Sequence, residues 1–210
     1  MDKKPEKSQV FLKSIAKLLP YLTLESKTKR VLELGCGKGI ISHFLAEHFS
    51  YFKGIEIDEK FSSLLKTVNV NFSDFTTYEK QEAFDLFVSN LPFKNYLQFL
   101  FKTLKEHPEI EYYYIIVQAE VGNEILSGKR RINKIIGHHF ESTFLCKIGR
   151  LQYEPIPKVD TIFLKLKKIR CYDDRIEKLK TIRQGKKIAK FGKSFYALTK
   201  REFEELLDSL

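Results

Sequence analysis

A short polar turn follows a buried strand near the middle of this chain, and its residue types are suited to chemistry. The apolar run at residues 84–88 is typical of a strand, and Asn90, Leu91, Pro92 and Phe93 come soon after it. This order places a carboxamide, a fixed turn and an aromatic ring at the end of a strand. Ligands bind at the carboxyl ends of the strands in open α/β sheets. We therefore predict a reaction site at this turn.

A glycine-rich turn lies upstream, at the end of another short apolar strand. Gly35, Gly37 and Gly39 form a Gly-x-Gly-x-Gly pattern that opens into a predicted helix. Closely spaced glycines let a ligand approach the backbone and face the helix N-terminus. A dinucleotide fingerprint would need its third glycine where Ile40 stands, and a phosphate-binding loop would need Ser or Thr after Lys38. Both alternatives are excluded.

Two carboxylates follow at positions that suit a nucleoside. Glu56 lies near the end of the next predicted strand, where a carboxylate can accept hydrogen bonds from both ribose hydroxyls. Asp74 follows the third strand, where it can meet the amino edge of an adenine ring. The glycine turn is thus followed by one carboxylate suited to a ribose and one suited to an adenine, and the fingerprint for a pyrophosphate is missing. This combination predicts S-adenosylmethionine as the cofactor.

The reacting turn then has a direct chemical interpretation. The exocyclic amine of adenine is a poor nucleophile because its lone pair is delocalised into the ring. If the Asn90 side-chain oxygen and the Leu91 carbonyl accept its two hydrogens, the lone pair points at the activated methyl group. Pro92 fixes the turn, and Phe93 can stack on the extruded base. Catalysis would come from positioning and a charged leaving group, with no metal and no strong base.

These segments resemble, in order, those of the rRNA adenine N6-dimethyltransferases, which include small-subunit dimethyladenosine transferases and erythromycin-resistance methylases. The resemblance covers roughly the first four-fifths of the chain, in segments at residues 9–12, 32–39, 55–58, 74, 90–93 and 155–161. Leu91 is informative, because DNA and protein-glutamine methylases that use this turn usually carry a second proline there. The Pro-x-Pro-Lys-Val-Asp segment that begins at Pro155 is also typical of the rRNA group.

The resemblance implies roles for individual residues. The cofactor contacts would come from Val10, Leu12, Gly35, Gly37, Glu56, Asp74 and Asn90. Phe93 and Tyr153 would sandwich the target adenine. The family usually has Asn in place of Val10, so a contact there must come from the backbone. The part after Cys171 is shorter than the helical C-terminal domain typical of the family.

The predicted elements define the fold class. Strands are expected at residues 30–34, 52–57, 68–72, 84–89, 112–118, 141–148 and 161–167, and helices at 8–22, 40–49, 59–67, 96–106, 119–126 and 130–138. Alternating strands and helices followed by two successive strands predict an α/β fold. We expect a doubly wound, Rossmann-like methyltransferase sheet that is mostly parallel with an antiparallel edge strand.

We expect two parts, a methyltransferase domain at residues 1–170 and a short basic helical tail at 171–210. The stretch from Arg175 to Arg201 is dense in Lys and Arg, with only Glu177 opposing them, and it contains Phe191, Phe195 and Tyr196. This tail could grip phosphates and stack on bases. Alternatively, it could be a solvated helical tail whose aromatic side chains dock on the main domain.

Composition limits which partners and which cellular compartment are expected. A net charge of +10 and a pI near 9.3 favour a polyanionic partner, although lysine-rich compositions have other origins. Three scattered cysteines indicate a reducing compartment, and no apolar run approaches the roughly 18 residues of a membrane span. His138 and His139 have no third ligand at metal spacing. We therefore expect a cytoplasmic monomer that binds ribosomal RNA or a ribosomal subunit, with no membrane and no metal.

Three functions remain open from the sequence. The first is methylation, once or twice, of adenine N6 in rRNA, most simply small-subunit rRNA, with the erythromycin-resistance type of large-subunit methylase as its variant. The second is a non-catalytic rRNA-binding assembly factor that retains the fold, which predicts damage to the cofactor turn or the reacting turn. The third is methylation of DNA adenine or a protein amide, against which Leu91 argues.

Overall fold

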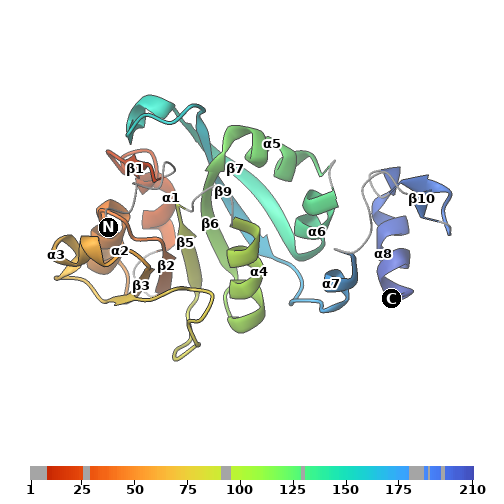
Figure 1. The fold of residues 1–210 in the computed structure, drawn as a ribbon, viewed down its shortest axis with the longest axis horizontal. Coiled ribbons are helices and arrows are strands. Elements are labelled where there is room, and N and C mark those ends of the chain that lie inside the picture. Colours follow the sequence, from red (N-terminus) through yellow and green to blue (C-terminus); the bar gives the residue numbers. More distant parts are fainter. Residues whose placement is uncertain are drawn as a thin grey trace, which may run out of the picture.

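A seven-stranded sheet forms the centre of the molecule (Figure 1). The computed structural model describes residues 9–25, 29–90, 96–128, 131–179, 187–188, 190–194 and 197–210. The sheet has the order β4-β3-β2-β5-β6-β9-β7 and is built from β2 (Arg30–Leu34), β3 (Tyr51–Glu56), β4 (Val70–Phe72), β5 (Leu86–Ser89), β6 (Tyr112–Gln118), β7 (Phe140–Ile148) and β9 (Thr161–Lys168). The five strands from β4 to β6 are parallel, whereas β9 runs antiparallel to β6 and to the edge strand β7. The predicted fold class is confirmed.

The order of the strands reverses at β2. The chain steps outward from β2 to β3 and β4 on one side, and β5 then returns to the other side of β2. β2 and β5 are almost entirely buried, as expected of central parallel strands covered on both faces. Their carboxyl ends lie together, because Leu34 and Ser89 are register partners.

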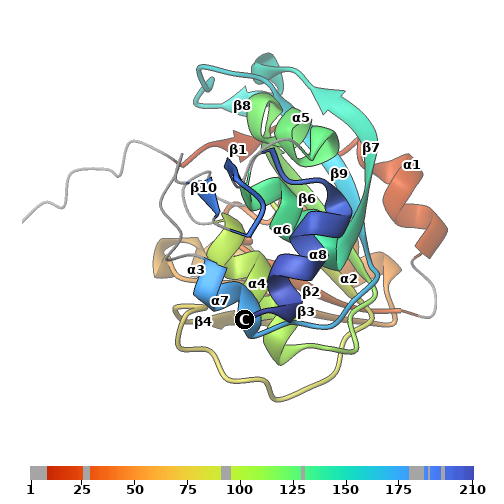
Figure 2. The ribbon, with the colours of Figure 1, turned by 90° about the vertical axis from the view of Figure 1, so that its right-hand side faces the viewer.

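Helices cover both faces of the sheet (Figures 1 and 2). Val31 and Leu32 are successive residues of β2 and therefore face opposite sides. Val31 packs in one apolar cluster with residues of α1 (Leu19–Leu22) and α2 (Ile40–His48). Leu32 packs in another with residues of α4 (Tyr96–Glu106), α5 (Ala119–Ser127) and α6 (Arg131–His139). Each fully buried aliphatic side chain contributes about 1.5–3 kcal/mol of transfer free energy.

The predicted helix at residues 8–22 is wrong over most of its length. Phe11 and Leu12 form a strand, β1 (Phe11–Leu12), which pairs antiparallel with β8 (Tyr153–Glu154). Only the end of this segment is helical, as α1. Pro20 lies in the first turn of α1, where the N–H that proline lacks would have no helical partner. The pairing with a strand about 140 residues away overrides the local helical spacing. Ser8, the first residue of the predicted helix, lies outside the described residues.

Shorter elements complete the body. The predicted helix at 59–67 is a 3₁₀ turn, η2 (Glu59–Phe61), followed by one helical turn, α3 (Ser62–Leu65). The Asp58 side chain caps this segment by accepting a hydrogen bond from the Lys60 N–H. Further 3₁₀ turns follow α1 and precede β8, as η1 (Thr23–Glu25) and η3 (Arg150–Gln152). Within the described ranges, no helix combines the length and apolar character needed to cross a membrane.

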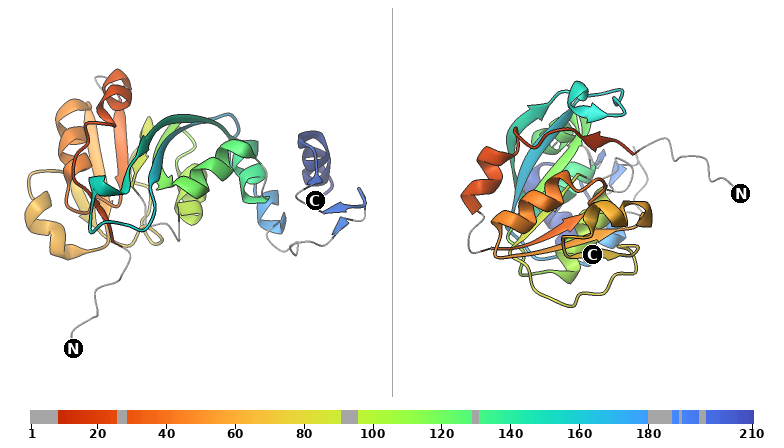
Figure 3. Two further views of the ribbon diagram at one scale, coloured as in Figure 1. Left: turned by 90° about the horizontal axis from the view of Figure 1, so that it is seen from above. Right: turned by 90° about the vertical axis from the view of Figure 1, so that its left-hand side faces the viewer.

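The C-terminal segment lies at the end of the molecule opposite α3 (Figures 1 and 3). It is not purely helical, because β10 (Lys187–Ile188) and β11 (Lys193–Ser194) form a small hairpin between α7 (Arg175–Leu179) and α8 (Lys200–Asp208). Its apolar side chains join the α4–α6 cluster through Ile176, Leu179, Leu198, Phe203, Leu206 and Leu207.

Ion pairs also hold this segment. The acids of α8 pair with basic residues from the segment after β9, from α7, from the hairpin and from α8 itself: Glu202 with Lys193, Glu204 with Arg170, Glu205 with Arg201 and Asp208 with Arg175. Phe191 packs partly buried against the cluster, whereas Phe195 and Tyr196 lie outside the described residues. The packing agrees with the docked-tail alternative for the described part.

Candidate active site

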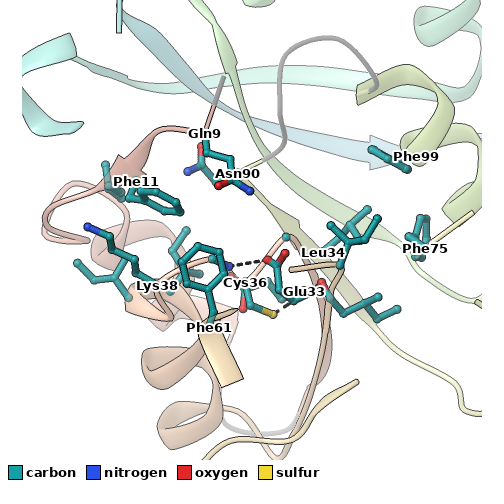
Figure 4. A pocket seen from close by; sticks show the side chains of 18 of the residues that line it. Gln9, Phe11, Glu33, Leu34, Cys36, Lys38, Phe61, Phe75, Asn90 and Phe99 are labelled. Carbon is teal, nitrogen blue, oxygen red and sulfur yellow. Dashed lines mark hydrogen bonds between the residues drawn. The ribbon is translucent and has the colours of Figure 1, made fainter. Parts of the chain in front are cut away.

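A pocket opens at the carboxyl ends of β2, β3, β4 and β5, where the strand order reverses (Figure 4). This is where an open α/β sheet binds its ligand. The pocket is lined by all seven residues predicted to contact a cofactor: Val10, Leu12, Gly35, Gly37, Glu56, Asp74 and Asn90. Residues from five separate parts of the sequence therefore meet at one cavity. Val10 and Leu12 reach it because β1 is held by its pairing with β8.

The glycine turn presents open backbone to this pocket. Gly35 and Gly37 have φ values of +78° and +52°, a region that side-chain-bearing residues rarely adopt. A Cβ built on Gly35 would meet no atom within 4 Å, so a ligand can approach the backbone there. A Cβ on Gly37 would instead lie 3.1 Å from the ring of Phe11. The Gly35 N–H donates to the carbonyl oxygen of Ile55 over 2.9 Å and so anchors the turn to β3.

Glu56 is fixed by two backbone donors. Its Oε2 accepts from the Gly37 N–H at 2.7 Å, and its Oε1 accepts from the Asp58 N–H at 2.9 Å. The residue is 6% exposed and lines the pocket. Each carboxylate oxygen has a second acceptor site. Glu56 can therefore accept hydrogen bonds from two neighbouring hydroxyls, as on a ribose.

Asp74 lies beside the aromatic part of the pocket. Its Oδ1 accepts from the N–H and from the hydroxyl of Thr76, both at 2.8 Å, and these bonds hold the pKa of the carboxyl below its usual range. The neighbouring Phe75 and Phe99 line the pocket and contact each other edge-to-face, with 5.8 Å between their ring centroids. An ionised acceptor next to aromatic rings suits a flat base with an exocyclic amine.

Asn90 lines the same pocket, immediately after β5. The preceding Ser89 is buried, and its hydroxyl donates to the carbonyl oxygen of Leu34 over 2.7 Å. This bond joins the end of β5 to the start of the glycine turn. Leu91, Pro92 and Phe93 lie outside the described residues, so their predicted roles remain predictions.

Tyr153 does not lie where the resemblance placed it. Its side chain is 0% exposed, packs in the α1–α2 cluster and shares a 2.7 Å hydrogen bond with the Thr161 hydroxyl. It is absent from the described lining of the pocket. A ring with no accessible surface cannot stack on an incoming base in this conformation. The predicted stacking role of Tyr153 therefore stays a prediction, and it would require the ring to leave the α1–α2 cluster.

Glu33 is a pocket residue that the sequence analysis did not select. It is 1% exposed, and its Oε2 has no hydrogen-bond partner among the described residues. Burial raises the pKa of this carboxyl to about 7, although Ser42 and Cys36 partly oppose the shift. The available signal was an acid inside an otherwise apolar strand that ends at the glycine turn. An acid in such a strand is costly unless it meets a polar or charged group.

The histidine pair lies far from the pocket, at the end of α6. His138 Nδ1 is 3.2 Å from Glu204 Oε1, and burial lowers the pKa of His139 to about 4. Across the described ranges, His, Cys, Asp and Glu side chains form no cluster arranged to hold a metal ion.

The sheet order and the pocket at its switch point define a Rossmann-like methyltransferase fold. The crystal structure of the 23S rRNA methyltransferase ErmE has the same fold, with a TM-score of 0.69 and 20% identity over 95% of this chain and 99% of that one. The model of the family described as "Ribosomal RNA adenine dimethylase" matches residues 3–182. The chain therefore belongs to the ribosomal RNA adenine dimethylase family, as the resemblance predicted.

Two curated relatives are both named ribosomal RNA small subunit methyltransferase A. The protein of Onion yellows phytoplasma is 30% identical over 185 residues, which cover 79% of this chain and 69% of the relative. The protein of Mycoplasmopsis pulmonis is 25% identical over 157 residues, which cover 69% of this chain and 62% of the relative. The chain thus spans about two-thirds of the length of these relatives.

Proposed function

We propose that this protein is an S-adenosylmethionine-dependent methyltransferase that methylates the N6 amine of adenine in ribosomal RNA, once or twice. The observation that carries the proposal is the convergence of the Gly35 turn, Glu56, Asp74 and Asn90 on one pocket. The names of the relatives favour small-subunit rRNA as the substrate. The net charge of +10 suits such a polyanion.

The residues of the pocket fit this cofactor. The fixed Glu56 carboxylate would accept hydrogen bonds from the ribose hydroxyls. Asp74 would accept a hydrogen bond from the amine of the cofactor's adenine, beside Phe99. The open backbone at Gly35 leaves room for the chain that links ribose and methionine. When bound, S-adenosylmethionine would supply a methyl group from a positively charged sulfonium sulfur, which leaves as a neutral thioether while the methylated amine loses one proton.

Asn90 would then act on the target base. Its side-chain oxygen would accept one hydrogen of the N6 amine and the Leu91 carbonyl the other, which turns the nitrogen lone pair toward the methyl donor. Phe93 would stack on the extruded base. We propose that this step needs no metal, because positioning and the positive charge of the sulfonium donor supply the rate enhancement. Asn90 and the cofactor turn belong to one chain, which supports our proposal that the protein acts as a monomer.

The division of the chain follows from this proposal. Residues 1–170 would form the methyltransferase domain, and residues 171–210 a short basic appendage that contributes to RNA binding. Because rRNA is the proposed substrate, the place of action would be the cytoplasm, where ribosomes are assembled.

Methyl transfer to defined substrates tests the proposal. The protein is incubated with radiolabelled S-adenosylmethionine and with 30S subunits, 50S subunits or naked rRNA, and the modified base is mapped. We expect label on N6 of an adenine in the small subunit. Label on the large subunit would assign the erythromycin-resistance type of activity. Cofactor binding without transfer to any of the three substrates would contradict the methylation of rRNA and favour a non-catalytic assembly factor.

A further inference from the structure

The charged side chains around the pocket are unequal in sign. Glu33, Glu56 and Asp74 are acidic, and Lys38 is the one basic residue among its described lining residues. S-adenosylmethionine carries two positive groups, a sulfonium and an ammonium, and one negative group, the methionine carboxylate. Three acids in the pocket suit the positive groups, the hydroxyls and the amine. The carboxylate needs a cation, and Lys38 is the candidate.

The position of Lys38 agrees with this assignment. In Figure 4, Lys38 lies at one end of the pocket, and Phe75 and Phe99 lie at the other. The aromatic end, with Asp74, suits the cofactor's adenine. A cofactor oriented in this way places its methionine part at the glycine turn, where Lys38 stands between Gly37 and Gly39.

Lys38 is free to change partners. Its Nζ lies 3.4 Å from Glu154 Oε2 and 5.0 Å from the centroid of the Phe11 ring. The two charged side chains of the pair are 46% and 69% exposed. Exposed ion pairs of this kind add little to stability. A lysine ammonium on its flexible stem can exchange such a partner for a better-placed anion.

We infer that Lys38 binds the carboxylate of the cofactor's methionine and gives up Glu154 when the cofactor enters. The inference rests on the proposed function, and it adds a recognition role for one residue of the glycine turn. The competing explanation is that Lys38 is only a tether, which holds β8 to the glycine turn through Glu154.

Calorimetric titration with two ligands separates these explanations. S-adenosylmethionine has the carboxylate, and decarboxylated S-adenosylmethionine lacks it. The unmodified protein should bind the first ligand about 5–20 times more tightly than the second, the range for one partly exposed charge-assisted contact. Lys38→Gln should lose most of that preference, because its affinity for S-adenosylmethionine falls while its affinity for the decarboxylated ligand is unchanged.

Two further variants serve as controls. Glu154→Gln removes the competing partner, so its affinity for S-adenosylmethionine should equal or exceed that of the unmodified protein. The tether explanation predicts the opposite, a loss similar to that of Lys38→Gln. Lys66→Gln removes an exposed lysine that does not line the pocket, and it should leave both affinities unchanged.

The inference is overturned if Lys38→Gln weakens both ligands equally, or neither, or if Glu154→Gln weakens binding as much as Lys38→Gln. Failure of the unmodified protein to bind either ligand is a different result. That result would remove the proposed cofactor itself, and with it the basis of this inference.

Discussion

The hydroxyl of Ser89 donates to the carbonyl oxygen of Leu34 across 2.7 Å, at the point where two central parallel strands end. Ser89 is fully buried and Leu34 nearly so. Gly35 follows the first of these strands and Asn90 follows the second, so the bond fixes the separation between Gly35 and Asn90. One buried hydrogen bond thus connects the predicted reacting turn to the predicted cofactor turn.

Ser89→Ala should therefore affect both stability and turnover. Loss of a buried hydroxyl-to-carbonyl bond costs about 1 kcal/mol of unfolding free energy. Methyl transfer should fall more than cofactor affinity, because Asn90 loses its positioning. Urea unfolding and steady-state kinetics measure the two effects. Ser50→Ala is the matched control, since Ser50 also donates to a backbone carbonyl, that of Lys29, but is exposed. Equal effects of the two variants would contradict the prediction.

Asn90→Ala should abolish methyl transfer, with a loss of at least about 100-fold, because one of the two acceptors that orient the target amine disappears. Cofactor affinity should largely survive, since the Gly35 turn, Glu56 and Asp74 remain. Single-turnover transfer and calorimetric titration distinguish the two. Asn69→Ala is a control, because Asn69 bonds to the Tyr51 hydroxyl outside the pocket. Unchanged turnover in Asn90→Ala would remove the proposed mechanism.

Glu33 predicts a dependence of stability on pH. Its pKa is about 7 in the folded protein, against about 4.5 for an unperturbed glutamate. The folded state therefore binds the proton more tightly than the unfolded state. The contribution of Glu33 to the free energy of unfolding is therefore fully present below about pH 4.5, and it is lost as the pH rises through 7. The difference corresponds to about 3 kcal/mol.

Glu33→Gln should remove this contribution to the pH dependence. The variant should be more stable than the unmodified protein at pH 8 and should show a flatter decline in unfolding free energy between pH 5 and 8. Chemical unfolding at several pH values measures it. A parallel decline in both proteins would show that another group titrates.

Tyr153→Phe tests the structural role assigned to this residue. Removing the hydroxyl breaks its bond to Thr161, and we expect a loss of about 1 kcal/mol of unfolding free energy. The rate of methyl transfer should be unchanged, because the ring is buried outside the pocket. Tyr153→Leu should likewise keep its affinity for RNA if it folds. A selective fall in RNA affinity in either variant would restore the stacking role.

The basic tail should contribute to RNA binding through its exposed charges. Lys190 and Lys200 are exposed, and their joint replacement by Gln should weaken binding and reduce the salt slope of log K by about one to two. Deletion of the whole tail is a poorer test, because its apolar side chains belong to the core. Replacement of Lys29 and Lys53 by Gln is the control. Lys29 immediately precedes β2 and Lys53 lies in β3, and both strands belong to the central sheet and not to the tail. The same salt slope of log K in the unmodified protein and in both double variants would show that the tail does not contribute to RNA binding.

Much of the fold follows from local patterns. The uninterrupted apolar run at residues 112–118 and the amphipathic spacing at 96–106 predicted β6 and α4 with the observed bounds. The failure at residues 8–22 has a physical cause, because the same apolar spacing also suits an extended segment whose partner is distant. The tail combines a hairpin with two helices, and its apolar side chains pack in the same cluster as those of α6.

The sequence by itself indicated the fold class, the family and seven of the residues that line the pocket. These follow from strand-terminal signals, and parallel strands bring such signals to one edge of the sheet. Only the tertiary structure decided that Tyr153 is buried, that Glu33 lines the pocket with an Oε2 that has no hydrogen-bond partner in the described part of the chain, and that Lys38 is paired with Glu154. Burial and charge pairing depend on which distant segments come together, as when the pairing of β1 with β8 accompanies the contact of Glu154 with Lys38.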